Sequence, residues 1–161
     1  MELQSLKKVQ EIINDIKIGM FTTTTQHRNL TSRPMTTQEV DDNGDVWFFT
    51  SDETGILVDI IEHPKVSLSY SSAEKNSFLS LSGVAKAVVD KDKMKELYTP
   101  ILKAWFPKGL EDPTLILIKV HIDEAEYWDG TSSKLVQAFK IGKAIVSGNQ
   151  YSSGEHEKLV N

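Results

Sequence analysis

The side chains best suited to chemistry gather where a predicted strand gives way to a predicted helix. Thr50, Ser51 and Thr54 place hydroxyls there, and Arg33 lies on the preceding strand of the same predicted hairpin. A helix N-terminus suits a phosphate because it offers free backbone N–H groups and a partial positive charge. An arginine can add a charge-assisted hydrogen bond. The pattern indicates an anion site, while helix capping by Ser51 or Asp52 and a surface position for Arg33 are the ordinary alternatives.

Other chemistries find little support in the sequence. The acidic run Asp41-Asp42-Asn43-Gly44-Asp45 has its glycine too early for a calcium loop, and no glutamate follows at the twelfth position. The histidines lie far apart without the spacing of a metal site: His27, His63, His121 and His156. The chain has no cysteine and no Gly-x-Ser-x-Gly motif. We therefore expect no metal centre and no hydrolytic or thiol nucleophile, and no catalytic residue is identified.

Composition narrows the possible partners. The chain has 161 residues, a net charge of -5 and scattered lysines, which argues against nucleic-acid binding. Its only arginines are Arg28 and Arg33. Residues 1–10 lack the apolar core of a signal peptide, and no long run is free of charges. The expectation is a cytoplasmic protein that binds neither nucleic acid nor membrane.

Apolar periodicity predicts the secondary structure. An amphipathic helix is predicted over residues 3–16, with Gly19 marking its exit. Strands are predicted over residues 18–25, 30–40, 46–50, 66–70, 78–89, 115–121 and 125–128. Further helices are predicted over residues 51–62, 90–105 (interrupted by Pro100) and 135–145. Asn43-Gly44 predicts a hairpin turn, and Gly83 predicts a bulge or a close backbone approach.

These elements predict one domain over residues 1–161, because no internal repeat divides the chain. Tight turns rather than crossover helices join neighbouring strands, which argues against a doubly wound parallel sheet. The predicted fold class is mainly β with flanking helices, as a six- to seven-stranded antiparallel closed or split barrel.

Several motifs, taken in order and spacing, resemble one known family. Two of them flank the candidate anion site: Ser32-Arg33-Pro34-Met35 and Trp47-Phe48-Phe49-Thr50. The others are His63-Pro64 ahead of Val66-Ser67-Leu68, Leu81-Ser82-Gly83-Val84-Ala85, Trp105-Phe106-Pro107, Ala125-Glu126-Tyr127-Trp128-Asp129 and Gly154-Glu155-His156-Glu157-Lys158-Leu159. Together they resemble the pyridoxamine 5'-phosphate oxidase-like FMN-binding split barrels, and the last three resemble the general-stress branch of that family.

The resemblance implies FMN held at the interface of a homodimer. It implies these cofactor-binding residues: Arg33, Pro34 and Met35 along one strand, Phe49, Thr50 and Ser51 at the ring and ribityl chain, and Thr54 and Gly55 near the phosphate. Trp105 and Trp128 are candidates for the cover that the second subunit supplies, with core or dimer packing as an equal alternative.

One position departs from the family pattern. The family usually has a lysine in the first turn of the helix that follows Thr50, and Ile56 stands there in this chain, next to Gly55. Losing one charged hydrogen bond costs roughly 1.5–3 kcal/mol, or about ten- to a hundredfold in affinity. The departure predicts weaker FMN binding, or a site adapted to another flavin or a deazaflavin.

The resemblance also bears on activity. Oxidases of pyridoxamine phosphate resemble one another in using arginines late in the chain, and no arginine follows Arg33 here, so that reaction is not expected. A low-activity flavin-dependent oxidoreductase of the general-stress type is expected instead, using a reduced nicotinamide or another small-molecule donor. A flavin-binding protein without turnover and a barrel kept for protein contacts are the alternatives.

Overall fold

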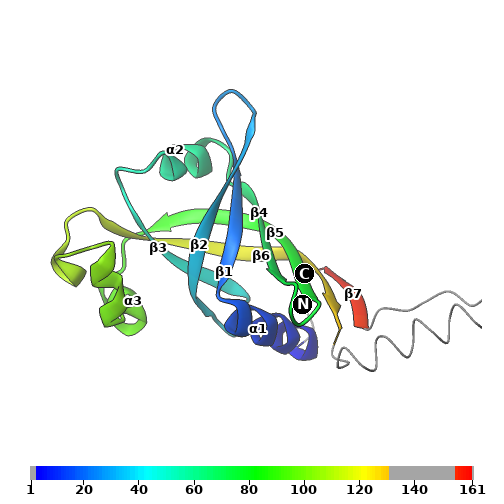
Figure 1. Cartoon of the computed structure of the whole chain (residues 1–161). Helices are drawn as coiled ribbons and strands as arrows, with labels where there is room; N and C mark the ends of the chain where they lie inside the picture. Colours follow the sequence, from blue (N-terminus) through cyan, green and yellow to red (C-terminus); the bar gives the residue numbers. More distant parts are fainter. Residues whose placement is uncertain (1–2, 131–154, 161) are drawn as a thin grey trace, which may run out of the picture.

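The chain folds as an antiparallel β-barrel. The computed structural model describes residues 3–130 and 155–160. Seven strands follow the order β3-β2-β1-β4-β5-β6-β7, and an added β3–β6 pairing closes the first six into a barrel (Figure 1). The strands are β1 (Ile18–Thr24), β2 (Leu30–Val40), β3 (Asp45–Ser51), β4 (Lys65–Ser72), β5 (Ser77–Val88), β6 (Leu115–Asp129) and β7 (Glu155–Val160). The split-barrel fold class predicted from the sequence is confirmed.

Alternation along the strands builds the core. In β4, Val66, Leu68 and Tyr70 are buried while the serines between them are exposed, as the period of two of a β-strand requires. By contrast, β3 is buried on both faces. Its Phe48 lies in the main core, whereas Trp47 and Phe49 belong to a second apolar cluster outside the barrel.

Helices cover the barrel at three places. They are α1 (Leu3–Ile16), α2 (Gly55–Glu62), α3 (Lys91–Leu97) and two short 3₁₀ helices, η1 (Pro100–Ala104) and η2 (Gly109–Glu111). Figure 1 shows α1 and α2 at opposite ends of the barrel and α3 at its side. Met94 of α3, Leu97 of α3 and Leu102 of η1 pack in the second cluster. No helix in the described part of the chain is long and apolar enough to cross a membrane.

The first helix ends differently from the prediction. Lys17, rather than a glycine, takes the left-handed backbone conformation that ends α1, with φ 64°. Gly19 lies inside β1, where a Cβ would come within 2.7 Å of the Tyr70 ring. The glycine is therefore explained by close packing against Tyr70 and does not mark the exit of the helix.

Three predicted elements in the second half of the chain differ from the observed ones or lie outside the described residues. The strands predicted over residues 115–121 and 125–128 are one continuous strand, β6, because a bulge opposite Ser82 and Gly83 absorbs the break in the apolar pattern. The helix predicted over residues 90–105 is α3 followed by η1, with Pro100 opening the second. The helix predicted over residues 135–145 lies outside the described residues, and β7 was not predicted as a strand.

Candidate functional site

Strands β2 and β3 separate partway along their hairpin. Their pairing consists of Val40↔Val46, Glu39↔Trp47 and Thr37↔Phe48, with a register shift between Thr37 and Glu39. Within the described sheet, residues 30–36 of β2 pair with β1 and residues 49–51 of β3 pair with β6. The facing edges of the two strands are therefore not joined by sheet pairing, and such edges carry backbone donors and acceptors. The candidate residues of both strands lie along these edges.

A buried hydrogen bond fixes the point of separation. The Tyr70 hydroxyl and Thr37 Oγ1 are 2.6 Å apart. Burial raises the pKa of Tyr70 to about 12, so the phenol stays protonated at neutral pH. The Thr37 N–H also donates to the Lys17 carbonyl. These contacts attach β2 to β4 and to the start of β1 where β2 leaves β3.

Arg33 lies in a polar cluster at the α2 end of the barrel. It pairs with Phe21 across the β1–β2 ladder and shares the inward face of that fully buried side chain. Arg33 Nη2 donates to Thr23 Oγ1 at 3.0 Å and to Asp59 Oδ2 at 3.4 Å. The Thr23 hydroxyl donates to Asp59 Oδ2 at 2.7 Å. Asp59 thus compensates the charge of Arg33.

The Arg33 guanidinium is not fully satisfied. Its Nη1 is buried and has no hydrogen-bond partner among the described residues. Buried donors in native proteins nearly always have a partner, so an unpaired one calls for an explanation. Arg33 is therefore neither a plain surface residue nor an isolated cation: Nη2 is anchored by Thr23 and Asp59, while Nη1 is buried without a partner among the described residues.

Hydroxyls gather at the start of α2. Thr50 Oγ1 and Thr54 Oγ1 are 3.2 Å apart, and the Thr54 hydroxyl donates to the Ser51 carbonyl at 2.7 Å. Thr54 is the N-cap residue of α2, yet its side chain makes no capping hydrogen bond. Ser51 Oγ accepts from the Glu53 N–H at 3.2 Å. A Cβ added to the exposed Gly55 would meet nothing within 4 Å, so the surface is open at this residue.

Other predicted residues of the site point in different directions. Pro34 is exposed on the outer face of β2, and Met35 packs partly buried against the main core. Phe49 belongs to the second apolar cluster. Ile56 is 2% exposed and lies in the main core. Within one chain, Arg33 contacts α2 through Asp59, and Thr50, Ser51, Thr54 and Gly55 lie at the start of α2.

The two candidate tryptophans lie on other elements than Arg33 and the α2 residues. Trp105 follows η1 and is 67% exposed. Trp128 lies near the end of β6, where it pairs with Phe78 and stacks on the His156 ring with centroids 5.1 Å apart. Among the described residues, neither ring makes a hydrogen bond or a ring contact with Arg33.

Sequence reasoning missed two residues of the site, Thr23 and Asp59. Thr23 lies in a strand of polar and apolar residues and is 1% exposed. The sequence does contain a signal for Asp59. It lies on the buried face of α2 with Ile56 and Ile60, and Ile56 is one helical turn away. A single acid on an otherwise apolar helix face predicts a buried partner of opposite charge.

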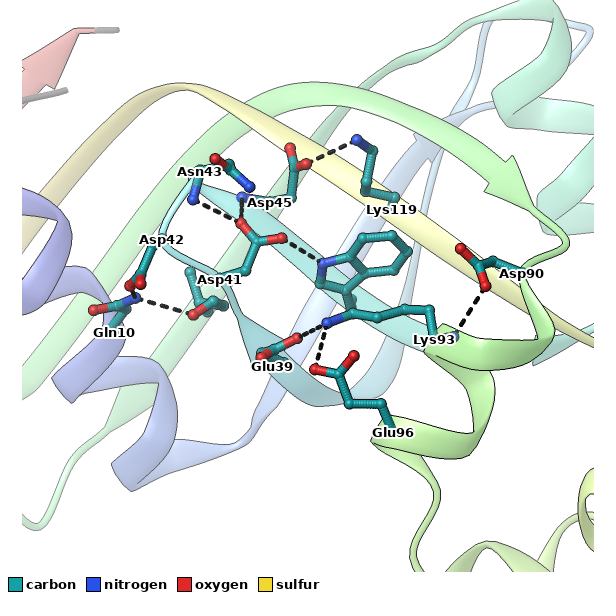
Figure 2. Close-up of polar contacts among 12 residues, drawn as sticks. Gln10, Glu39, Asp41, Asp42, Asn43, Asp45, Asp90, Lys93, Glu96 and Lys119 are labelled. Carbon is teal, nitrogen blue, oxygen red and sulfur yellow. Dashed lines mark hydrogen bonds and ion pairs between the residues drawn. The ribbon is translucent and has the colours of Figure 1, made fainter.

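A second polar group surrounds Trp47 on the same hairpin. Figure 2 shows Asp41 accepting from the Asn43 and Asp45 N–H groups, and its other oxygen accepts from Trp47 Nε1 at 2.9 Å. Lys93 Nζ and Lys119 Nζ lie 5.2 Å and 5.7 Å from the Trp47 ring centroid. Lys93 also pairs with Glu39 and Glu96. We call this set, with Asp45 and His121, the Trp47 network.

Most charges of the Trp47 network are paired with one another, and Asp41 accepts from N–H groups instead. Asp45 accepts from Lys119 Nζ at 2.7 Å and lies 2.7 Å from His121 Nδ1. Burial acts to raise the pKa of Asp45, but the hydrogen bonds from Lys119 and His121 outweigh it and lower the pKa. Across residues 3–130 and 155–160, no group of three His, Cys, Asp or Glu side chains could hold a metal ion. The polar side chains of the network are thus matched by partners within the chain.

The chain is similar in sequence to proteins from fungi and bacteria. It is 26% identical to Protein bli-3 of Neurospora crassa over 155 aligned residues. This alignment covers 90% of this chain and 74% of the relative. It is 27% identical to the general stress FMN/FAD binding protein of Xanthomonas citri, whose solved structure has a TM-score of 0.69 and covers 81% of this chain and 92% of that chain.

Other solved structures share the fold. A structure from Jannaschia sp. CCS1 that carries the name general stress protein 26 has a TM-score of 0.82 at 21% identity and covers 99% of this chain and 100% of that chain. A Clostridium acetobutylicum protein related to general stress protein 26 has a TM-score of 0.69 at 19% identity and covers 82% and 93%. Residues 4–152 match the family described as pyridoxamine 5'-phosphate oxidase like. The split barrel and this match over most of its length place the chain in one family: it belongs to the pyridoxamine 5'-phosphate oxidase-like proteins.

Proposed function

We propose that this protein binds FMN in a homodimer and acts as a low-activity flavin-dependent oxidoreductase of the general-stress type. The observation that carries the proposal is the separation of β2 from β3. The separation leaves two strand edges without sheet pairing to each other, and β3 leads directly into the start of α2. Family membership and the 27% identity to a protein named for FMN/FAD binding support the same ligand class.

The chemistry of the residues fits the uncharged part of a flavin. A flavin ring carries carbonyl and nitrogen acceptors, and its ribityl chain carries hydroxyls. Thr50, Ser51 and Thr54 are small hydroxyl side chains that can both donate to and accept from such groups. Arg33 Nη1 is a buried donor without a partner among the described residues. Backbone groups on the unjoined edges beside Pro34, Met35 and Phe49 would add further contacts.

A second subunit is proposed to cover the site. Large apolar side chains are exposed at several places in the described chain, among them Ile18, Met20 and Leu30 on β1 and β2, and Ile101 and Trp105 around η1. Exposed apolar surface of this kind is typical of protein interfaces. We propose that Trp105 or Trp128 of the second copy shields the flavin that Arg33 and the α2 residues hold in the first.

The proposed chemistry belongs to the cofactor. A bound flavin supplies hydride or electron transfer between a reduced nicotinamide, or another small-molecule donor, and an acceptor. This chain's own residues would bind and orient the ligand, and the hydroxyls and Arg33 would fix its ring and ribityl chain. The acid Asp59 is bound to Thr23 and Arg33, so its role is to orient the guanidinium.

A flavin-binding protein without turnover is the second candidate, and one observation favours it. The titratable side chains at the site, Arg33 and Asp59, are paired with each other, which leaves no evident acid or base among the described site residues. Steady-state oxidation of NADH and NADPH with added FMN distinguishes the two. Turnover well above that of free FMN supports the oxidoreductase, and turnover equal to free FMN supports the binding protein.

The experiment that tests flavin binding is a titration of FMN against wild type and Arg33→Gln, followed by flavin fluorescence and thermal shift. Arg28→Gln is the matched control, because Arg28 is the only other arginine and is exposed in the β1–β2 turn. Saturable binding that is weakened about tenfold in Arg33→Gln and unchanged in Arg28→Gln supports the site. Absence of binding to folded wild type rejects the proposed function.

A further inference from the structure

The entrance to the proposed flavin site has little positive charge to offer a phosphate. Asp52 and Glu53 are exposed directly before α2. The helix itself, of sequence Gly-Ile-Leu-Val-Asp-Ile-Ile-Glu, contains no lysine or arginine. Arg33 is the cation that the structure ties to this region, and it is already paired with Asp59 at 3.4 Å. Within the described residues, the charges of Asp52, Glu53, Asp59 and Arg33 sum to a net negative charge around the start of α2.

The helix dipole does not overcome this balance. A helix N-terminus is equivalent to roughly half a positive charge, whereas Asp52 and Glu53 each bring a full negative charge close to it. The Thr54 hydroxyl, which could have donated to an anion, donates to the Ser51 carbonyl instead. A phosphate dianion placed here would gain backbone N–H contacts and meet two nearby carboxylates. Its net contribution to affinity is therefore small.

Ile56 is aligned with the lysine of the family and is part of the core. Ile56 is 2% exposed and packs in the main apolar cluster, so its side chain does not reach the entrance. The neighbouring Gly55 is the position that opens outward, since a Cβ there meets nothing within 4 Å. A cation could be accommodated at Gly55 without disturbing the barrel, and the sequence has none there.

We propose that this site recognises the flavin ring and ribityl chain and draws almost no affinity from the phosphate, so that it binds riboflavin as tightly as FMN. The inference rests on the flavin binding proposed above. It departs from the anion contact that the sequence predicts for Arg33 and from the position near the phosphate that the resemblance implies for Thr54. Instead it assigns the affinity to Arg33, to the hydroxyls of Thr50, Ser51 and Thr54, and to the strand edges, which would meet uncharged parts of the ligand. FMN binding is then also nearly independent of ionic strength, because few charges are brought together.

The first test is calorimetric titration of the full chain with FMN and with riboflavin at about pH 7.5, where the phosphate is mainly a dianion. Dissociation constants for FMN and riboflavin within about threefold of each other, or about 0.7 kcal/mol in binding free energy, support the inference. Riboflavin binding more than about tenfold weaker than FMN overturns the inference and leaves the proposed function standing. Binding of neither ligand overturns both.

The second test installs the missing charge. Gly55→Lys is compared with Gly55→Gln, which has similar length and no charge, after circular dichroism has shown that both fold. Gly55→Lys is expected to tighten FMN binding by about tenfold and to leave riboflavin unchanged. Gly55→Gln is expected to leave the ratio of the two affinities at its wild-type value. Equal tightening of both ligands by Gly55→Lys, or no effect on FMN, overturns the proposal that an unfilled charge position limits the use of the phosphate.

Discussion

The Trp47 network and the Arg33 site are built on the same β2–β3 hairpin, yet their polar groups are matched very differently. In the Trp47 network, Asp41 accepts three hydrogen bonds and Asp45 contacts both Lys119 and His121. At the Arg33 site, Nη1 has no partner among the described residues and the N-cap side chain leaves its helix uncapped. The first lies where the strands are paired, and the second where they have parted.

The difference shows where hydrogen-bonding capacity is left for a ligand. Paired strands bring side chains into fixed register, so their polar groups can satisfy one another within the chain. Strands that part lose this register, and the groups on their edges need another partner. The predictions below test whether the Trp47 side of the hairpin is tightly matched and the α2 side loosely matched.

The largest effect is expected for Gly83→Ala, on the strand beside the Trp47 network. A Cβ at Gly83 would lie 2.1 Å from the His121 carbonyl oxygen, which is backbone and cannot rotate away. Moving it would shift β6 and the contacts of Asp45, so we expect a loss of about 3 kcal/mol in the free energy of unfolding. Urea denaturation monitored by Trp fluorescence measures it. A loss below about 1 kcal/mol would show that the backbone here yields easily.

Next in size is Asp45→Asn, which removes the charge that Lys119 and His121 share. Because Lys119 and His121 are partly exposed, the expected loss at neutral pH is about 1–2 kcal/mol, below that of a fully buried pair. The folded-state pKa of Asp45 is lowered. Its stabilisation is therefore present above the unfolded pKa of about 4 and is lost as pH falls through the folded pKa.

The pH dependence gives Asp45→Asn an internal control. Wild type and variant should differ in stability at neutral pH and converge as the solution is acidified through the lowered folded-state pKa of Asp45. Thermal unfolding across this range checks the convergence. A constant difference at every pH would mean that the loss comes from altered packing and not from the charge of Asp45.

A smaller loss, about 1 kcal/mol or less, is expected for Asp59→Asn. The asparagine oxygen can still accept from Thr23, and the contact that loses its charge is the long one of 3.4 Å to a guanidinium that is 27% exposed. Denaturant unfolding of Asp59→Asn beside Asp45→Asn makes the comparison direct. A larger loss of stability for Asp59→Asn than for Asp45→Asn would contradict the proposal that polar groups are better paired in the Trp47 network than at the Arg33 site.

The smallest effect, and of opposite sign, is expected for Gly55→Ala. The position is exposed, opens α2 and has free space around a Cβ, so alanine should stabilise the protein by about 0.5 kcal/mol through its higher helix propensity. The melting temperature followed by circular dichroism should rise slightly, in contrast to its fall in Gly83→Ala. A fall at Gly55 as well would show that the α2 entrance is more tightly packed than its open surroundings imply.

Local sequence patterns were sufficient for much of the fold. The predicted second strand matches β2, and the predicted first helix matches α1, because apolar periodicity reports which face is buried. The Asn43-Gly44 turn also falls where the hairpin bends, with Gly44 at φ 77°. Predictions failed where a local signal had a nonlocal cause. Gly19 is required by close packing against Tyr70, and the break in the apolar pattern before Ala125 is a bulge against β5.

The candidate site divides in the same way. The sequence alone predicted Arg33, Thr50, Ser51 and Thr54 as site residues, since charged and hydroxyl side chains at a strand–helix junction carry a chemical signal of their own. Only the tertiary structure decided that Arg33 is paired with Asp59 through a cluster that includes Thr23, and that Ile56 is core while Gly55 is open. Asp59 is 26 residues from Arg33 along the chain. Closure of the barrel under α2 brings them together, and no pattern of neighbouring residues encodes that distance.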